Sequence, residues 1–168
     1  AAADVRDARR FGVQVPDGVG VDFAAVMERV RRVRAEIAPH DSAQRFASLG
    51  VDVFLGEGRF VDPQALEVAG AVLRFKRAVV ATGARAVALP IPGLAEAGFL
   101  TNETVFELEQ RPSRLAVIGA GPIGCELAQC FARLGVRVTL LEVAPQILVR
   151  EDPDAAAIVQ DALVRDGV

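Results

Sequence analysis

The sequence predicts an α/β protein with incomplete parallel sheets, helices packed on them, and a small β-meander. Three observations lead to this fold class. The last third of the chain alternates short apolar runs with segments of helical spacing. A glycine-rich turn follows the first of those apolar runs. Ahead of them, short β-type runs are broken by turn residues, which is the pattern of a meander.

The first expected element is a helix over Asp22–Ile37. Apolar residues recur there at helical spacing, Asp22 stands at the N-cap position, and Pro39 follows the end. Arginines fall largely on the opposite side, which indicates a solvated face, with a phosphate-binding cluster as the alternative. They are Arg29, Arg31, Arg32 and Arg34.

A second, shorter helix and a strand are expected next. Asp41 and Gln44 have the spacing of a capping box, which predicts a helix over Asp41–Leu49 that stops at Gly50. The composition of Val51–Gly56 predicts a strand.

Residues 59–83 are expected to form the meander, with breaks at 62–63 and 69–70. Its last run ends in Ala81–Gly83, where small residues leave room for a flat or bulky ligand against the backbone. An ordinary exit from a strand into a loop is the alternative. After a proline-containing loop, Thr101–Leu108 is expected to be a short capped helix.

The C-terminal part reads as strand, helix, strand, helix. The expected ranges are Leu115–Ile118, Pro122–Leu134, Arg137–Glu142 and Pro153–Asp166, and Asp152 is the expected N-cap of the last helix. Strands joined through a helix by short loops indicate a parallel sheet.

The glycine turn carries the main functional signal. Gly119, Gly121 and Gly124 fit G-x-G-x-x-G between an expected strand and an expected helix. The first glycine permits a sharp turn, the second lets a pyrophosphate approach the backbone, and the third lets helix and sheet pack closely. The first-turn amides of the helix have no intrahelical partner and carry partial positive charge. The sequence therefore predicts a Rossmann-type dinucleotide site over Gly119, Ala120, Gly121, Pro122, Ile123 and Gly124.

Glu142 completes this unit at the end of the second strand. Its carboxylate is placed to accept hydrogen bonds from the adenosine ribose hydroxyls, whereas a 2′-phosphate would meet like charge. We therefore expect NAD rather than NADP as the preferred cofactor. Arg150 qualifies this expectation, because an arginine a few residues further on could reach a 2′-phosphate.

The remaining reactive residues favour structural roles. Cys125 and Cys130 lie on the same expected helix with side chains about 140° apart, so we expect packing rather than a disulfide. His40 is the only histidine and is expected in a loop or helix start, and we expect no metal site.

Composition narrows the class of protein. The 168 residues carry a net charge of −3 with mixed signs, which gives no indication of nucleic-acid or membrane binding. Two cysteines and no secretory signal predict a cytoplasmic protein. A first residue other than Met leads us to expect a piece of a longer protein, with a processed small protein as the alternative.

Three segments together resemble the class I pyridine nucleotide–disulfide oxidoreductases. They are "ATGARAVALPIPG", "TNETVFEL" and "LAVIGAGPIGCELAQCFARLGVRVTLLE". The likeness is greatest to the mercuric reductase-like and dihydrolipoamide dehydrogenase-like branches. It implies a flavoprotein in which an NAD(P) domain is inserted into an FAD domain, and a homodimer formed through a domain that this chain lacks.

By this resemblance, residues 1–110 form the later part of the first FAD-binding segment and residues 111–168 the first half of the NAD(P) domain. Gly58, Thr82, Gly83 and Ala84 then match backbone positions that contact FAD. Glu126 matches a helix glutamate near the flavin ring that pairs with a lysine of the redox segment.

Several features of the family have no match here. The flavin-binding glycine turn, the redox cysteine pair, the partner lysine and the dimerisation domain with its catalytic histidine are not found in this sequence. Cys125 and Cys130 do not match the redox pair, because they follow the second glycine turn.

The resulting hypothesis is a fragment of an enzyme that passes electrons from NAD(P)H through FAD to a disulfide or a metal ion. We expect no catalytic residue in this chain and no catalysis by it alone. The alternatives are a stand-alone dinucleotide-binding module and a dehydrogenase with a single cofactor. The substrate is left open.

Overall fold

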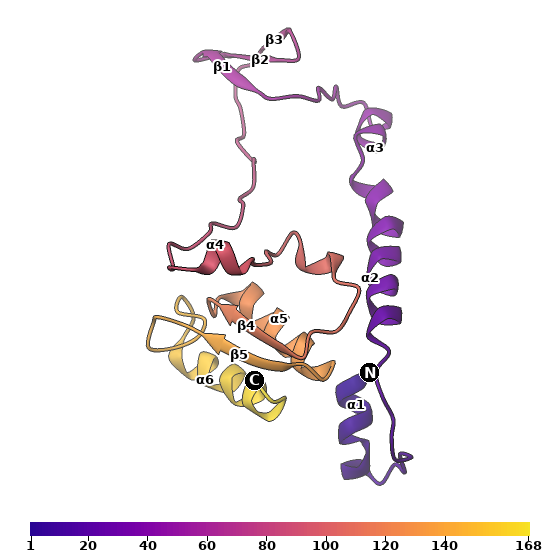
Figure 1. The fold of residues 1–168 in the computed structure, drawn as a ribbon. Coiled ribbons are helices and arrows are strands. Elements are labelled where there is room, and N and C mark those ends of the chain that lie inside the picture. Colours follow the sequence, from indigo (N-terminus) through magenta and orange to yellow (C-terminus); the bar gives the residue numbers. More distant parts are fainter. The chain divides into compact units, whose positions relative to one another are not determined.

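The structure is a computed structural model that describes residues 1–168 (Figure 1). Contacts between residues divide the chain into two compact units. The first unit comprises residues 1–29 and 100–168, and the second comprises residues 30–99. The predicted division at residue 110 concerns cofactor domains rather than compactness, so it stays a prediction.

A parallel strand pair forms the centre of the first unit. Strand β4 (Arg114–Ile118) pairs with β5 (Arg137–Leu141), so that Arg114 lies opposite Arg137 and Ile118 opposite Leu141. Helix α5 (Pro122–Arg133) connects the two strands, and α6 (Pro153–Arg165) follows them. The predicted order of strand, helix, strand and helix is therefore confirmed.

Local signals explain where these helices begin. Pro122 occupies the first position of α5, where its missing N–H costs no hydrogen bond. Asp152 is the N-cap of α6, and its Oδ1 accepts a hydrogen bond from the Asp154 amide at 3.0 Å.

The core of the first unit has two clusters of buried side chains. The larger one joins α5 and β5 to the start of α2 (Phe23–Ile37), and the Phe23 and Phe131 ring centroids lie 6.1 Å apart. Its buried members are Phe23, Met27, Val105, Ala128, Phe131, Val136 and Val138. The smaller cluster contains Ala120, Cys125 and Leu163. It joins the glycine turn to α5 and α6.

An N-terminal helix not expected from the sequence also belongs to the first unit. Helix α1 (Ala2–Asp7) continues into the 3₁₀ helix η1 (Ala8–Phe11), and neither buries a residue. An ion pair connects α1 to the end of α6, because Arg6 Nη2 lies 2.6 Å from Asp166 Oδ1.

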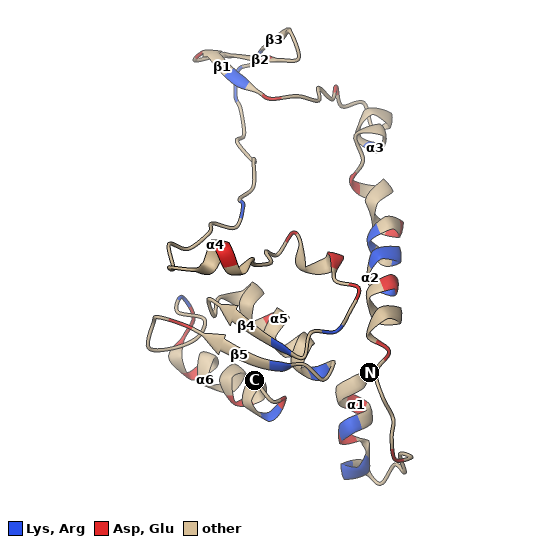
Figure 2. Ribbon diagram, in the orientation of Figure 1, with Lys and Arg blue, Asp and Glu red and all other residues tan.

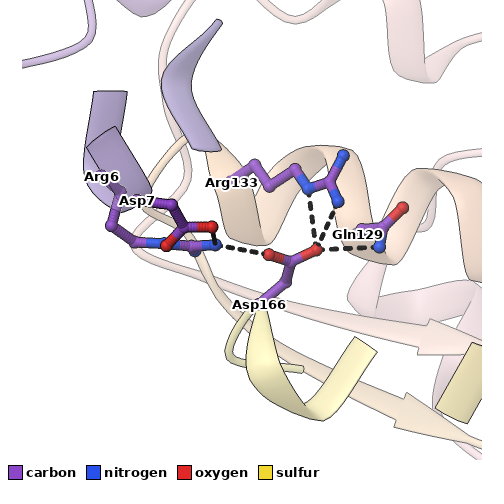
Figure 3. A network of polar contacts seen from close by, with 5 residues as sticks. All are labelled: Arg6, Asp7, Gln129, Arg133 and Asp166. Carbon is purple, nitrogen blue, oxygen red and sulfur yellow. Dashed lines mark hydrogen bonds and ion pairs between the residues drawn. The ribbon is translucent and has the colours of Figure 1, made fainter. Parts of the chain in front are cut away.

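Asp166 is the centre of a polar network (Figure 3). Its side chain is 6% exposed, and its second oxygen accepts hydrogen bonds from Gln129 at 2.8 Å and from Arg133 at 2.7 Å. Burial alone would raise the pKa of Asp166, but the bonds from Arg6, Arg133 and Gln129 outweigh burial and lower it. The network joins three helices, α1, α5 and α6.

The second unit contains the predicted meander. Strands β1 (Arg59–Asp62), β2 (Ala65–Val68) and β3 (Ala71–Arg74) form an antiparallel sheet in the order β1-β2-β3. The turn between β2 and β3 places Ala69 and Gly70 at φ values of 49° and 79°. Two consecutive positive φ values are typical of the two-residue turns that match strand twist.

Short helices complete the second unit. They are η2 (Ala38–Asp41), α3 (Ala43–Ser48) and α4 (Leu94–Ala97). The predicted capping box of α3 is wrong by one residue, because Ser42 is the N-cap and its Oγ accepts the Arg45 amide at 3.1 Å. Asp41 instead ends η2.

Helix α2 agrees with its prediction. Asp22 Oδ1 accepts a hydrogen bond from the Ala25 amide at 3.0 Å, as expected of an N-cap. Arg29, Arg32 and Arg34 are exposed and Arg31 is half-buried, which agrees with a largely solvated face. Figure 2 shows acidic residues among these basic ones, and Arg32 Nε lies 3.9 Å from Glu36 Oε1.

One predicted strand is absent, and the last run of the predicted meander ends earlier than expected, at Arg74. Val51–Gly56 and residues 78–83 have no regular secondary structure and pair with no other strand. Composition favours extended backbone in both segments, but a strand also needs a neighbour for its N–H and C=O groups.

The expected helix over Thr101–Leu108 is reduced to the 3₁₀ turn η3 (Val105–Glu107). Two threonine hydroxyls bond backbone amides just before it, in the reciprocal arrangement of a helix N-terminal cap. Thr104 Oγ1 accepts the Thr101 amide at 2.9 Å, and Thr101 Oγ1 accepts the Glu103 amide at 3.2 Å.

Candidate dinucleotide-binding site

The glycine turn connects the end of β4 to the start of α5. The Gly119 amide donates to the Leu141 carbonyl at 2.8 Å, which extends the β4–β5 pairing into the turn. Gly119 then has a φ of 100°, which residues with side chains rarely adopt. This conformation turns the chain out of the sheet.

Gly124 allows the start of α5 to lie directly against the turn. A Cβ atom built on Gly124 would overlap the carbonyl oxygen of Gly119 and would lie 3.1 Å from its carbonyl carbon. No side chain fits without a backbone shift. Steric overlap therefore explains why the third residue of the motif, Gly124, is a glycine.

Gly121 has a different environment. It is exposed, its φ of −71° suits any residue, and a Cβ built on it would meet no atom within 4 Å. Pro122 and Ile123 beside it are also exposed. The Cys125 amide donates to the Gly121 carbonyl at 3.0 Å and begins the intrahelical bonding, so the amides of the first turn point out of the helix end. This open end can receive an anion.

Glu142 lies at the same end of the strand pair. Its Oε2 accepts the Ala120 amide at 2.8 Å, and its Oε1 accepts the Val143 and Ala144 amides at 2.7 and 3.0 Å. The amides of Ala144, Ala120 and Val143 lower the pKa of Glu142 below its usual range. An ionised carboxylate is therefore held beside the glycine turn.

The structure brings together one part of the predicted set. Gly119–Gly124 and Glu142 surround the open end of α5, and Glu126 is exposed on the same helix. Gly58, Thr82, Gly83 and Ala84 belong to the second unit, where all four are exposed. Gly83 has a φ of 69°, and a Cβ built on it would meet no atom within 4 Å. Contact of these four residues with FAD stays a prediction.

One contact at the turn was missed by sequence reasoning. The Leu148 amide donates to the Ala120 carbonyl at 2.8 Å, so the loop after β5 folds back onto the turn. Leu148 has a φ of 50°. Leucine is uncommon in this conformation, and no local pattern in the sequence indicates it.

The two cysteines are free thiols, as expected. Cys125 is buried and Cys130 is exposed, both on α5. His40 is exposed in η2. No group of three or more potential metal ligands occurs among the 168 residues. No helix has the length and apolar character needed to cross a membrane.

The parallel pair β4–β5, the connecting helix α5 and the glycine turn define a Rossmann-type α/β unit. The family described as pyridine nucleotide-disulphide oxidoreductase matches residues 13–168. The chain belongs to this family.

Curated relatives agree with this assignment. The chain is 35% identical over 158 residues to a mercuric reductase of Lysinibacillus sphaericus, covering 94% of this chain and 29% of the relative. It is 34% identical over 163 residues to a dihydrolipoyl dehydrogenase of Mycoplasma pneumoniae, covering 95% and 35% respectively. The chain thus spans about a third of the length of these relatives.

A solved structure shares the fold. It is the Cu(II) complex of the HOCl-induced flavoprotein disulfide reductase RclA from Escherichia coli. The TM-score is 0.70 at 30% sequence identity, over 98% of this chain and 36% of that chain. The predicted fold class and family resemblance are therefore confirmed.

Proposed function

We propose that this chain forms part of an FAD-dependent oxidoreductase and that its glycine turn binds the pyrophosphate of NAD(H). In such an enzyme, electrons pass from NAD(P)H through FAD to a disulfide or a metal ion. The cofactors supply this redox chemistry when bound. The chain's own residues bind and orient them, and we expect no turnover by these 168 residues alone.

The proposal rests chiefly on the position of Glu142 beside the open end of α5. Amides of the first helical turn are donors for phosphate oxygens, and the helix dipole favours negative charge there. The bare Gly121 leaves space for close approach, since a side chain built there meets no atom within 4 Å. The local geometry therefore fits a dinucleotide.

Glu142 supports a preference for NAD(H). Its carboxylate keeps a fixed position through three backbone amides while being exposed to solvent. A ribose with free hydroxyls can donate to it, whereas a 2′-phosphate would be repelled. Arg150, exposed in the following loop, is the residue that would favour NADP(H) instead.

We also propose that the second unit contributes to the binding of FAD. The exposed backbone at Gly58 and Thr82–Ala84 is the part of the second unit that would contact it. The relatives named mercuric reductase and dihydrolipoyl dehydrogenase suggest two classes of substrate.

The test uses the intact protein that carries this chain. It should purify with a flavin absorption spectrum or acquire one on incubation with FAD, and it should bind NADH in a calorimetric titration. Failure to take up FAD would remove the flavoprotein proposal. A protein that binds NADH but no flavin would support a stand-alone dinucleotide-binding module.

A matched pair of variants isolates the glycine turn. Gly121→Val fills the space for the pyrophosphate, and Gly20→Val is its control, because both glycines have open surroundings and no positive φ. Gly121→Val should abolish detectable NADH binding while Gly20→Val retains it. Equal binding by the two variants would exclude the glycine turn as the pyrophosphate site.

A further inference from the structure

Ala120 is the one buried residue of the glycine turn, and both its amide and its carbonyl are hydrogen-bonded. It is completely buried, although Gly121 and Pro122 beside it are exposed. Its amide donates to Glu142 Oε2 at 2.8 Å. Its carbonyl accepts two hydrogen bonds, from the Leu148 amide at 2.8 Å and from the Cys125 thiol at 3.4 Å. Both lone pairs of the carbonyl oxygen are thus occupied.

The carbonyl of Ala120 and the amide of Gly121 belong to one peptide group. No peptide bond in the chain is cis, so the C=O and N–H of this planar group point in opposite directions. The carbonyl is bound on the inner side by Cys125 and Leu148. The Gly121 N–H therefore points outward, toward the open end of α5.

A rotation of this peptide would have a large effect on anion binding. It would present the Ala120 carbonyl oxygen, which carries partial negative charge, where the Gly121 N–H now lies. Glycines on either side of Ala120 make such a rotation easier than in most chains. Some group outside the motif must therefore hold the peptide in one orientation.

Cys125 is well placed to do so. It lies on the first turn of α5, is 4% exposed, and packs with Ala120 and Leu163. Burial, and then the charges of Glu142 and Glu126, raise the pKa of Cys125. The side chain is therefore a protonated thiol that can donate a hydrogen bond.

Leu148 supplies the second bond at a conformational cost. Its left-handed backbone is disfavoured for leucine by about 1–2 kcal/mol. The same conformation lets its amide reach the Ala120 carbonyl, and its side chain packs against the Ala120 and Cys125 cluster. Strained residues of this kind persist where the surrounding contacts require them.

We propose that the Cys125 thiol and the Leu148 amide lock the Ala120–Gly121 peptide so that the Gly121 N–H faces the phosphate of a bound dinucleotide. This inference rests on the proposed function of the glycine turn. It makes Cys125 a positioning residue, with no contact to the cofactor and no redox role.

The test compares NADH binding by Cys125→Ala and Cys125→Ser in the intact protein. Cys125→Ala removes the donor and should weaken binding about three- to tenfold, since a hydrogen bond of ordinary net strength is lost. Cys125→Ser restores a donor and should bind within about twofold of the unchanged protein. Cys130→Ala is the control, because Cys130 is exposed on the same helix.

The outcomes distinguish three statements: that Cys125 acts through its hydrogen bond, that it acts only through packing, and that the glycine turn binds NADH at all. Equal binding by Cys125→Ala and the unchanged protein, or equal weakening by both Cys125 variants, would overturn the lock. Absence of NADH binding by the unchanged protein would instead refute the proposed function. If Cys125→Ser does not fold, the infrared S–H band that the unchanged protein shows and Cys125→Ala lacks decides, since this difference isolates the Cys125 thiol. A band shifted as for a bonded thiol supports the lock, and an unshifted band overturns it.

Discussion

The carboxylate of Glu142 accepts a hydrogen bond from the amide of Ala120, with 2.8 Å between nitrogen and oxygen. This bond joins the end of β5 to the turn that follows β4. The side chain that we propose to bind ribose is therefore fixed by the same turn that we propose to bind pyrophosphate. The ribose and the pyrophosphate of one bound dinucleotide would therefore contact protein groups that are hydrogen-bonded to each other.

Replacement of Glu142 should change cofactor preference. Glu142→Ala removes the proposed ribose acceptor, so NADH binding should weaken about tenfold while NADPH binding changes little. Calorimetric titrations with both cofactors measure this change. Asp161→Asn, an exposed acid on α6, controls for the change in net charge. Equal loss of affinity for NADH and NADPH would contradict the specificity argument.

Gly124→Ala should destabilise the first unit and disturb the glycine turn. The added methyl group would overlap the Gly119 carbonyl, and the required backbone shift should lower the free energy of unfolding by about 1–3 kcal/mol. Gly20→Ala, where nothing lies within 4 Å, should change it by less than about 0.5 kcal/mol. Urea denaturation measures both values, and similar stabilities for the two variants would refute the steric argument.

The part of the site that could be predicted depends on local signals. The G-x-G-x-x-G spacing, Pro122 and the Asp152 cap each act within a few residues, so the order β4, α5, β5, α6 was correctly predicted. The position of Glu142 was predictable because parallel strands end at the same edge of a sheet.

Features that depend on distant partners could not be predicted. Helix α1 buries no residue, and an ion pair connects it to the end of α6 through Arg6 and Asp166, which are far apart in sequence. The strand expected over Val51–Gly56 has no neighbour to pair with. The left-handed Leu148 depends on a carbonyl in the glycine turn, and nothing in its own neighbourhood indicates it.

The two thiols should differ in reactivity. Cys130 is exposed, whereas Cys125 is buried and its raised pKa disfavours the reactive thiolate. A charged thiol reagent at pH 8 should modify Cys130 rapidly and Cys125 only in denaturant. Peptide mass spectrometry identifies the modified residue. Rapid labelling of Cys125 in the native protein would show that the smaller core cluster is not packed as described.

Asp166 should contribute to stability in a pH-dependent way. Its hydrogen bonds and ion pairs lower its pKa in the folded state, so the unfolded chain binds more protons over the pH range between the two pKa values. The contribution is therefore complete above the ordinary aspartate pKa and is lost as pH falls through the lowered folded-state pKa.

Asp166→Asn should lower the free energy of unfolding at pH 7 by about 1–3 kcal/mol, because charged hydrogen bonds to Arg6 and Arg133 are lost. The difference between Asp166→Asn and the unchanged protein should shrink as pH falls through the acidic range, because Asp166 itself then becomes neutral. Urea denaturation at a series of pH values measures this difference, with Asp161→Asn as the control for an exposed acid on the same helix. A difference that stays constant down to the most acidic pH would show that Asp166 stabilises α1, α5 and α6 by packing rather than by its charge.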